Sequence, residues 1–204
     1  MIKIVVLSVI AIVCIYAAIR AFPRSEDISG GIIFVGDSLI AGCNWARLFH
    51  NPDIRNQRMR ANTCGDILRN MHRLTKRKPS KVFLMAGSND LYFGMSVSDV
   101  DRAYRKIIER LLKESPDTKI YIHGIPPVNT TMSSFIPAKS NQILQDMNGR
   151  LKQIAEELKV NYIELWPYFI KDGQMDRKFT RDGTHFSSSG YDRWKEAIQD
   201  LVNS

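Results

Sequence analysis

Cysteine is scarce in this chain: three of the 204 residues are cysteines. Three thiols are too few for the disulfide framework that stabilises many small secreted domains. Cys14 lies in an apolar N-terminal stretch, which leaves Cys43 and Cys64 in the remainder of the chain. Two interpretations stay open for this pair: small, partly buried side chains, or one disulfide in a compartment outside the cytoplasm.

The motifs of nucleotide and metal chemistry are absent as well. The chain contains no G-x-x-x-x-G-K-S/T and no G-x-G-x-x-G, so it has no motif for nucleotide binding. The four histidines lie far apart, without the H-E-x-x-H or Cys/His spacing of a zinc site: His50, His72, His123 and His185. We therefore expect neither a metal nor another cofactor. A G-x-S-x-G elbow is also missing, so the usual α/β-hydrolase signature is excluded.

Acidic residues are outnumbered by basic ones, 21 to 29, and the formal net charge is +8. This surplus raises the question of nucleic acid, but the basic residues are scattered and no platform of aromatic and basic residues is evident. We therefore expect no nucleic-acid partner. The densest basic run, KRKPSK at 76–81, is either a solvated connection or part of a surface that favours anionic lipid or acidic polysaccharide.

The N-terminal stretch differs from the rest of the chain. An apolar run of 16 residues extends from Ile4 to Ile19 and is flanked by Lys3 and Arg20. A full membrane span needs about 20 such residues, so this run fits an uncleaved signal anchor or a removed signal peptide. We expect membrane attachment through residues 1–22, a linker at 23–30 and a domain at 31–204 outside the cytoplasm. A secreted or periplasmic protein, released by cleavage, is the alternative.

Strand and helix signals alternate from residue 31 onward, with no internal repeat and no low-complexity tract. Short apolar runs indicate buried strands, and apolar residues at helical spacing indicate helices. The expected strands are 31–36, 54–59, 81–87, 119–125 and 161–166. The expected helices are 39–50, one that carries Ile67, Leu68, Met71 and Leu74, and then 96–115, 141–159 and 189–202. This alternation favours one α/β domain, with a parallel sheet between helices on both faces.

Polar residues follow directly after two of the expected strands. Asp37 and Ser38 follow the first strand, and Asn89 follows the third. In a parallel sheet, binding and catalysis gather outside the carboxyl ends of the strands, so we expect these side chains at one edge. A serine at such a turn suits a nucleophile, whereas a simple helix cap is the alternative. Asn89 is either an amide donor for a substrate or an ordinary turn residue.

A third polar stretch, DGTH at 182–185, precedes the last expected helix. One turn of chain puts Asp182 beside His185, where a carboxylate fixes the imidazole tautomer and stabilises the imidazolium. A capped helix start with a surface histidine is the alternative. Together with Ser38 and Asn89, this pair supplies a nucleophile, a base, an orienting carboxylate and an oxyanion donor.

The blocks GDSL at 36–39, GSND at 87–90 and DGTH at 182–185 together resemble the signatures of the SGNH hydrolases, also called the GDSL esterase/lipase family. The likeness runs from Ile32 to about Ile198. It implies a flavodoxin-like three-layer sandwich with strand order 2-1-3-4-5, and a serine hydrolase that needs no metal. It further implies that Ser38 is the nucleophile, His185 the general base and Asp182 its partner.

The resemblance also implies an oxyanion hole built from the backbone N–H of Ser38 and the side chain of Asn89. One block departs from the family pattern, which reads Asn-x-Gly-x-x-Gly after the second strand. An alignment on Asn56 places Arg58 at the first glycine and Ala61 at the second, so the N–H of Ala61 is the expected third donor. A shifted alignment gives this role to Gly65.

Within the family, GCNWARLF at 42–49 is most similar to the branch of platelet-activating-factor acetylhydrolase-like and sialate O-acetylesterase-like proteins. This resemblance implies hydrolysis of a short-chain, acetyl ester of a carbohydrate or lipid through an acyl-enzyme. The alternatives are a sugar O-acetyltransferase, a lysophospholipase or thioesterase, and a binding module without activity.

The long connection at 126–141 exceeds the length of a tight turn, and such loops often carry function. Met132, Phe135 and Ile136 on this loop are predicted to form an apolar wall for an acyl chain or sugar, and Asp37 is a further predicted substrate contact. Simple packing of the loop onto the domain is the alternative.

Overall fold

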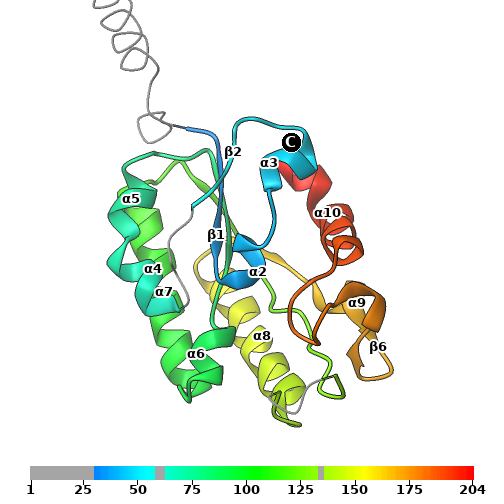
Figure 1. The fold of residues 1–204 in the computed structure, drawn as a ribbon. Helices are drawn as coiled ribbons and strands as arrows, with labels where there is room; N and C mark the ends of the chain where they lie inside the picture. Colours follow the sequence, from blue (N-terminus) through cyan, green and yellow to red (C-terminus); the bar gives the residue numbers. More distant parts are fainter. Residues whose placement is uncertain (1–29, 58–62, 133–135) are drawn as a thin grey trace, which may run out of the picture.

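The computed structural model describes residues 30–57, 63–132 and 136–204. Within them, five parallel strands form one sheet in the order β2-β1-β3-β4-β5 (Figure 1). Nearly every residue of the central strands is buried, as expected for a sheet that is covered on both faces. The strand order confirms the predicted fold. The strands are β1 (Ile32–Gly36), β2 (Ile54–Asn56), β3 (Lys81–Met85), β4 (Lys119–His123) and β5 (Asn161–Ile163).

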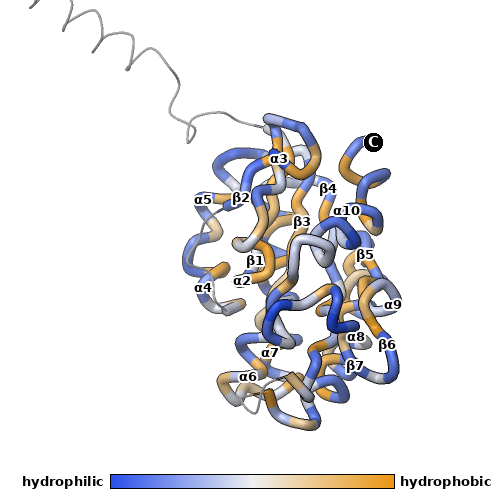
Figure 2. The backbone as a smooth tube through the Cα atoms, turned by 45° about the vertical axis from the view of Figure 1, so that its right-hand side comes forward, coloured by the Kyte–Doolittle hydropathy of each residue, from blue (hydrophilic) through white to orange (hydrophobic). Residues whose placement is uncertain are grey.

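Helices cover both faces of the sheet (Figure 1). One layer contains α4 (Cys64–Arg69), α5 (Met71–Thr75), α7 (Val97–Glu114) and α8 (Ser140–Glu157). The other contains α2 (Ser38–Ala41), α3 (Trp45–Phe49), α9 (Trp166–Phe169) and α10 (Ser188–Asn203). Figure 2 shows hydrophobic residues along the central strands, whereas the outer helices carry many hydrophilic ones. The three-layer arrangement agrees with the prediction from sequence.

The core consists of two clusters, one on each face of the sheet. Alternate residues of β1 belong to different clusters: Ile33 and Val35 face α4 and α7, whereas Phe34 faces α3 and α10. Phe34 stacks on Trp45 at 4.3 Å and on Phe83 at 4.8 Å between ring centroids. These aromatic contacts pack α3 against β1 and β3, next to the start of α2.

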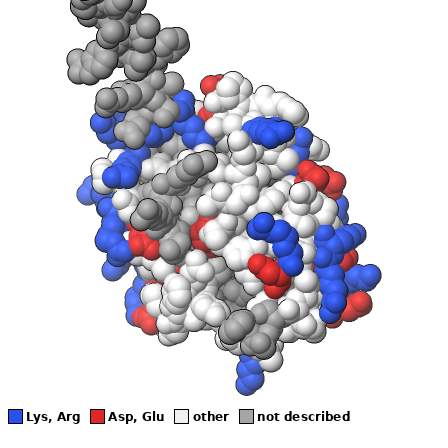
Figure 3. Space-filling view, in the orientation of Figure 1, with Lys and Arg blue, Asp and Glu red and all other residues white. Residues whose placement is uncertain are grey.

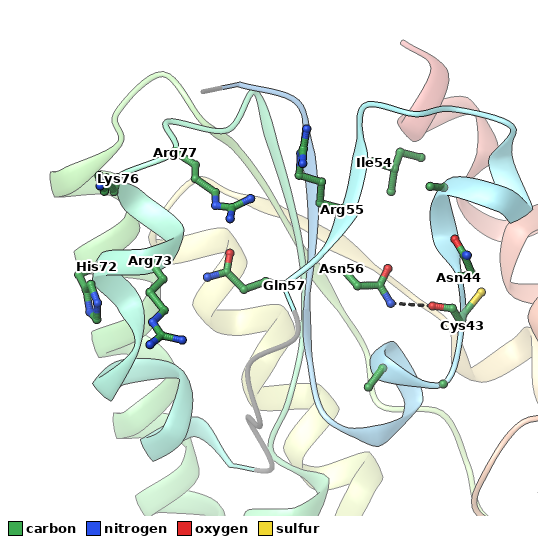
Figure 4. Close-up of a pocket in the computed structure, with 13 residues that line it drawn as sticks. Cys43, Asn44, Ile54, Arg55, Asn56, Gln57, His72, Arg73, Lys76 and Arg77 are labelled. Carbon is green, nitrogen blue, oxygen red and sulfur yellow. Dashed lines mark hydrogen bonds between the residues drawn. The ribbon is translucent and has the colours of Figure 1, made fainter. Parts of the chain in front are cut away.

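Two expected helices are each broken in the structure. The helix expected at 39–50 is α2 followed by α3, because Asn44 caps α3 by accepting a hydrogen bond from the Arg47 N–H. The amide of Asn56 also binds the carbonyl oxygen of Cys43, at 2.6 Å, and so holds the chain between the two helices (Figure 4). The helix around Ile67 to Leu74 is broken at Asn70, where α4 ends and α5 begins.

The thiols of Cys43 and Cys64 are both free in the structure. Of the two interpretations for this pair, the structure therefore has the separate side chains, with Cys64 fully buried and Cys43 partly so. Burial raises the pKa of the Cys43 thiol to about 12, and the negative charge of Asp192 acts in the same direction. Cys43 is therefore protonated at neutral pH and is a poor nucleophile.

The predicted signal anchor at 1–22 and most of the predicted linker at 23–30 lie outside the described residues. Among the residues that the structure does describe, no helix combines the length and apolar character that a membrane span requires. The proposed attachment to a membrane thus remains a prediction from the sequence.

Candidate active site

Ser38 is the first residue of α2 and follows β1 at its carboxyl end, after Asp37. Asp37 is the N-cap: its carboxylate accepts a hydrogen bond from the Leu39 N–H at 2.9 Å. The Ser38 N–H belongs to the first turn, whose amides have no acceptor inside the helix. The turn thus presents the Ser38 hydroxyl and a backbone donor at the same edge of the sheet.

The side chains of Ser38, His185 and Asp182 form a connected row. Ser38 Oγ lies 3.1 Å from His185 Nε2, and His185 Nδ1 lies 2.8 Å from Asp182 Oδ2. Since the Asp182 carboxylate accepts from Nδ1–H, Nε2 is the nitrogen that accepts the Ser38 proton. These contacts join segments 147 residues apart, and the arrangement matches the geometry of a Ser-His-Asp triad.

The turn that carries Asp182 and His185 is held by Thr180. Its hydroxyl donates to the His185 carbonyl at 2.9 Å and accepts from the Gly183 N–H at 2.9 Å. Gly183 has φ of +93°, and a Cβ there would lie 2.6 Å from the carbonyl oxygen of Asn129. Only glycine fits this close approach without displacing the backbone. The glycine of the DGTH block therefore sets how the carboxylate meets the imidazole.

Asp182 is ionised throughout the neutral range. Burial alone would raise its pKa, but hydrogen bonds from the His185 backbone and ring, and from the Thr184 N–H, outweigh it and lower the pKa to about 2. The backbone bonds are short, 2.7 Å from His185 N and 2.9 Å from Thr184 N. A fixed negative charge beside the imidazole stabilises the cation that forms when His185 takes a proton.

Three consecutive residues of the GSND block join three parts of the site. Ser88 donates to the Asp37 carboxylate at 2.7 Å, and Asp90 accepts from the Cys64 N–H at 3.0 Å. Asn89, between them, lines the same pocket as Ser38 and His185. Ser88 and Asp90 therefore orient the start of α6 (Ser88–Tyr92), which carries Asn89. Sequence reasoning assigned no role to either, because their partners lie 51 and 26 residues away.

We predict that Asn89→Ala lowers kcat for ester hydrolysis by about 10²- to 10³-fold, the typical loss when one oxyanion-hole donor is removed. The physical reason is that hydrogen bonds of Ser88 and Asp90, on either side of Asn89, orient the helix start that carries the amide donor, which an alanine side chain cannot replace. Steady-state kinetics on a chromogenic ester measure the effect. A change confined to KM would assign Asn89 to substrate binding instead.

Asp37 is only 3% exposed, and its carboxylate accepts hydrogen bonds from Leu39 N–H and Ser88 Oγ. Burial raises the pKa of this carboxyl, while the bonds from Ser88 and Leu39 partly offset that effect. Both contacts are directed into the protein. The geometry therefore favours a positioning role for Asp37, which orients Ser38, rather than the direct substrate contact that the sequence suggested.

A pocket of about 420 Å³ opens beside Ser38 and His185. Its other walls come from α6, α8 and the long connection after β4, and they are mostly apolar: Leu39, Leu91, Ile125, Pro126, Val128, Ile136 and Leu144. Of the three residues predicted to form the loop wall, Ile136 lines the pocket, together with Pro126 and Val128 of the same connection. Met132 is not among the described residues that line the pocket; it lies beside Gly183. Phe135 lies outside the described residues.

The second-strand block is described only in part. Asn56 binds the carbonyl oxygens of Ile40 and Cys43 and thereby supports the segment after α2. Ala61 and Arg58 lie outside the described residues, so the third oxyanion donor remains a prediction. Gly65, the alternative, is the second residue of α4 and directly follows Cys64, which begins that helix.

Residues 34–193 match the model of the GDSL-like lipase/acylhydrolase family. The chain belongs to this family. The match includes all three blocks on which the resemblance depended, and it confirms that prediction. The GDSL-like lipase/acylhydrolase domain thus accounts for residues 34–193 of the chain.

Two solved structures share the fold of this GDSL-like acylhydrolase. One, described as a platelet activating factor from Streptococcus pneumonia, has a TM-score of 0.79 at 24% identity, over 88% of this chain and 86% of that one. A GDSL-like lipase from Bacteroides thetaiotaomicron has a TM-score of 0.75 at 18% identity, over 92% of this chain and 95% of that one.

The GDSL-like chain is also 28% identical over 124 residues to an N-acylneuraminate cytidylyltransferase from Escherichia coli. That stretch covers 59% of this chain, which spans only 28% of the length of the curated enzyme. The similarity therefore concerns a minor part of the larger protein.

Proposed function

We propose that the protein is a serine esterase that works through an acyl-enzyme on Ser38. The observation that carries this proposal is the row of contacts from Ser38 Oγ to His185 Nε2, at 3.1 Å, and from His185 Nδ1 to Asp182 Oδ2, at 2.8 Å. The row ends at the mouth of an apolar pocket, where the carbonyl of an ester would meet the hydroxyl.

In the first half of the reaction, Ser38 Oγ attacks the ester carbonyl while His185 Nε2 takes the hydroxyl proton. The carbonyl oxygen becomes an oxyanion, which accepts from the Ser38 N–H, the Asn89 amide and, by prediction, the Ala61 N–H. Collapse of the tetrahedral intermediate breaks the bond to the alcohol, which leaves with the proton from His185. Asp182 keeps the ring oriented and stabilises its cationic form.

In the second half, water replaces the alcohol. His185 removes a proton from the water as its oxygen attacks the acyl carbon, and the same donors hold the second oxyanion. Breaking the bond to Ser38 Oγ releases the carboxylic acid and returns the proton to the serine. If a sugar hydroxyl took the place of water, the same steps would transfer the acyl group, so product analysis with a sugar acceptor present separates the two reactions.

The pocket suggests what the acyl group is. Its volume of about 420 Å³ greatly exceeds the roughly 30 Å³ that one water occupies, so it has room for far more than an acetyl methyl group. Tyr92 and Ile143 line it and are 61% and 40% exposed. This apolar volume favours an acyl chain of several carbons, as in a lysophospholipase or thioesterase. The predicted acetyl ester of a carbohydrate or lipid fits the same site but leaves much of it empty.

A series of p-nitrophenyl esters tests these proposals, with Ile143→Ser as the diagnostic variant. We expect kcat/KM to rise from acetyl to octanoyl in the native protein. Loss of the apolar side chain should lower kcat/KM for the octanoyl ester about threefold to tenfold more than for the acetyl ester, since burial of each methylene contributes roughly 0.8 kcal/mol.

Ile154→Val, in the core of α8 and away from the pocket, is the control for a general effect on that helix. A native profile that peaks at acetyl and does not change in Ile143→Ser would favour the acetyl esterase and contradict the chain-binding role. No turnover of any ester, with or without a sugar acceptor, would contradict the proposed function as a whole.

The cellular setting is part of this proposal. The apolar run at 4–19 is consistent with a catalytic domain that is tethered to a membrane and faces away from the cytoplasm, or with a secreted enzyme after cleavage. Both settings leave a small-molecule ester as the partner of the active site.

A further inference from the structure

A second hollow, of about 920 Å³, lies along the edge strand β2, and none of its described lining residues also lines the active-site pocket. Its walls are α5, the turn after α5, β2 and the chain between α2 and α3 (Figure 4). We call it the basic hollow, after the four cationic residues that line it: Arg55, Arg73, Lys76 and Arg77.

No carboxylate is found among the described residues that line the basic hollow. Within the described ranges, no ion pair involves the side chains of Arg73, Lys76 or Arg77. Figure 3 shows Lys and Arg side chains gathered on this side of the molecule, around α5. Positive charge that is concentrated in a concave surface without acidic neighbours attracts anions more strongly than scattered surface charge does.

The arginines are directed into the hollow. In Figure 4 the side chains of Arg73 and Arg77 extend from α5 and the turn after it toward β2, on the side where Gln57 lies. Arg73 is exposed and Arg77 is half-buried. Two guanidinium groups from the same wall present several N–H donors to one space, which suits the oxygens of a phosphate group.

The basic hollow also lies where the N-terminal part of the chain joins the domain. The Gly30 N–H donates to the Arg77 carbonyl at 2.7 Å, so the first described residue of the chain lies beside the hollow. Twenty-nine residues precede it in the sequence. Those residues contain the apolar run 4–19, followed by Arg20 and Arg24. Ten residues, 20–29, separate this run from Gly30, and an extended chain spans at most about 3.6 Å per residue, so a membrane that holds the run lies within roughly 40 Å of Gly30. Apolar insertion together with a basic patch is the combination that binds anionic membranes stably.

We propose that the basic hollow binds the phosphate groups of anionic lipids and seats the catalytic domain on a membrane surface. The contact between Gly30 and Arg77 lies at the amino end of β1, whereas Ser38 follows its carboxyl end. The basic hollow and the active-site pocket have no described lining residue in common. This proposal does not depend on the esterase activity.

Lipid selectivity of the full chain tests the proposal. Binding is measured by co-sedimentation with vesicles of phosphatidylcholine alone and with 30% phosphatidylglycerol, at about 0.1 M salt. The apolar run contributes to binding to both kinds of vesicle. The ratio of the two partition constants therefore isolates the effect of lipid charge on binding. Each basic residue at an anionic surface contributes roughly a factor of five. Arg73→Gln with Arg77→Gln should therefore lower the ratio about 25-fold, and added salt should lower the ratio of the native protein.

The matched control is Arg150→Gln with Lys152→Gln, which removes the same two charges from exposed positions on α8. This control should keep the native ratio, and a native thermal unfolding midpoint shows that both variants are folded. An unchanged ratio in the Arg73 and Arg77 variant overturns the proposal, and so does an equal loss in the control. A variant that keeps its lipid selectivity but loses retention on heparin would assign the hollow to an acidic polysaccharide.

Discussion

Replacing Ser38 with alanine should lower kcat for ester hydrolysis by about 10⁴- to 10⁶-fold, the range seen when the nucleophile of a serine hydrolase is removed. In the proposed mechanism the acyl group transfers to the Ser38 hydroxyl oxygen, and His185 Nε2 has no other hydroxyl within hydrogen-bond distance among the described residues. Residual activity would come from the oxyanion donors and from binding alone. Steady-state kinetics with a p-nitrophenyl ester measure the loss, and a fluorophosphonate probe should no longer label the protein.

Ser98→Ala is the control for this prediction, because Ser98 is exposed on α7 and distant from the pocket. It should keep both turnover and labelling. The Ser38 side chain is exposed, so its replacement should leave the unfolding temperature nearly unchanged. Turnover within tenfold of the native protein in Ser38→Ala would refute the proposed nucleophile, whatever the family match implies.

Asp182→Asn should lower kcat by about 10⁴-fold although it changes only one atom. An asparagine Oδ1 can still accept from the backbone N–H groups of Thr184 and His185, so the turn is retained. Its amide, however, donates toward His185 Nδ1, which forces the ring proton onto Nε2. That nitrogen can then no longer accept the proton of Ser38. The variant therefore isolates the contact between carboxylate and imidazole from the architecture of the loop.

The effect of Asp182→Asn can also be measured as a function of pH. The folded pKa of Asp182, about 2, lies below its ordinary value of 3.8, so its carboxylate is charged at every pH above about 4. Titration of Asp182 itself therefore contributes nothing to the loss in Asp182→Asn between about pH 6 and about pH 9, where the loss is measured. Asp172→Asn, in the exposed turn between β6 (Ile170–Lys171) and β7 (Gln174–Met175), is the control and should behave as the native protein. A loss below tenfold would reduce Asp182 to a residue that only shapes the turn.

The depression of the Asp182 pKa also contributes to the stability of the folded protein. A carboxyl whose pKa is lower in the folded state stabilises the fold above the pKa of the unfolded chain. That contribution is lost as the pH falls from about 4 toward 2. It is modest, because the side chain is 53% exposed and solvent screens its interactions.

The strands, the helices and the place of the site were predictable because they depend on local patterns, whereas the strand order came from the family resemblance. Apolar runs such as 81–87 and helical spacing such as that of 96–115 identify buried strands and amphipathic helices without knowledge of their partners. The carboxyl ends of parallel strands then meet at one edge, which brings Ser38 and Asn89 to one pocket. The contact between Asp182 and His185 follows from their spacing alone.

Features that depend on distant partners were not predictable in this way. The break between α2 and α3 depends on Asn56, which binds the carbonyl of Cys43 from another strand. Ser88 and Asp90 look like ordinary turn residues until Asp37 and the Cys64 N–H are placed beside them.

The β6–β7 hairpin had a local signal that the helix-and-strand alternation obscured. Asp172 and Gly173 both have positive φ, 51° and 76°, as a two-residue Asp-Gly hairpin turn requires. The flanking strands have only two residues each, too short for an apolar pattern to be recognised.

The hydrogen bond between Ser38 and His185 has a consequence for how the protein acquires activity during folding and loses it on denaturation. It joins residues 147 positions apart, so the nucleophile meets its base only after the last part of the chain has docked on the sheet. The C-terminal segment that carries Asp182 and His185 can open locally while the central strands stay intact. Inactivation by heat or denaturant would then precede global unfolding, and a nascent chain would have no hydrolytic activity until its C-terminal residues had left the ribosome.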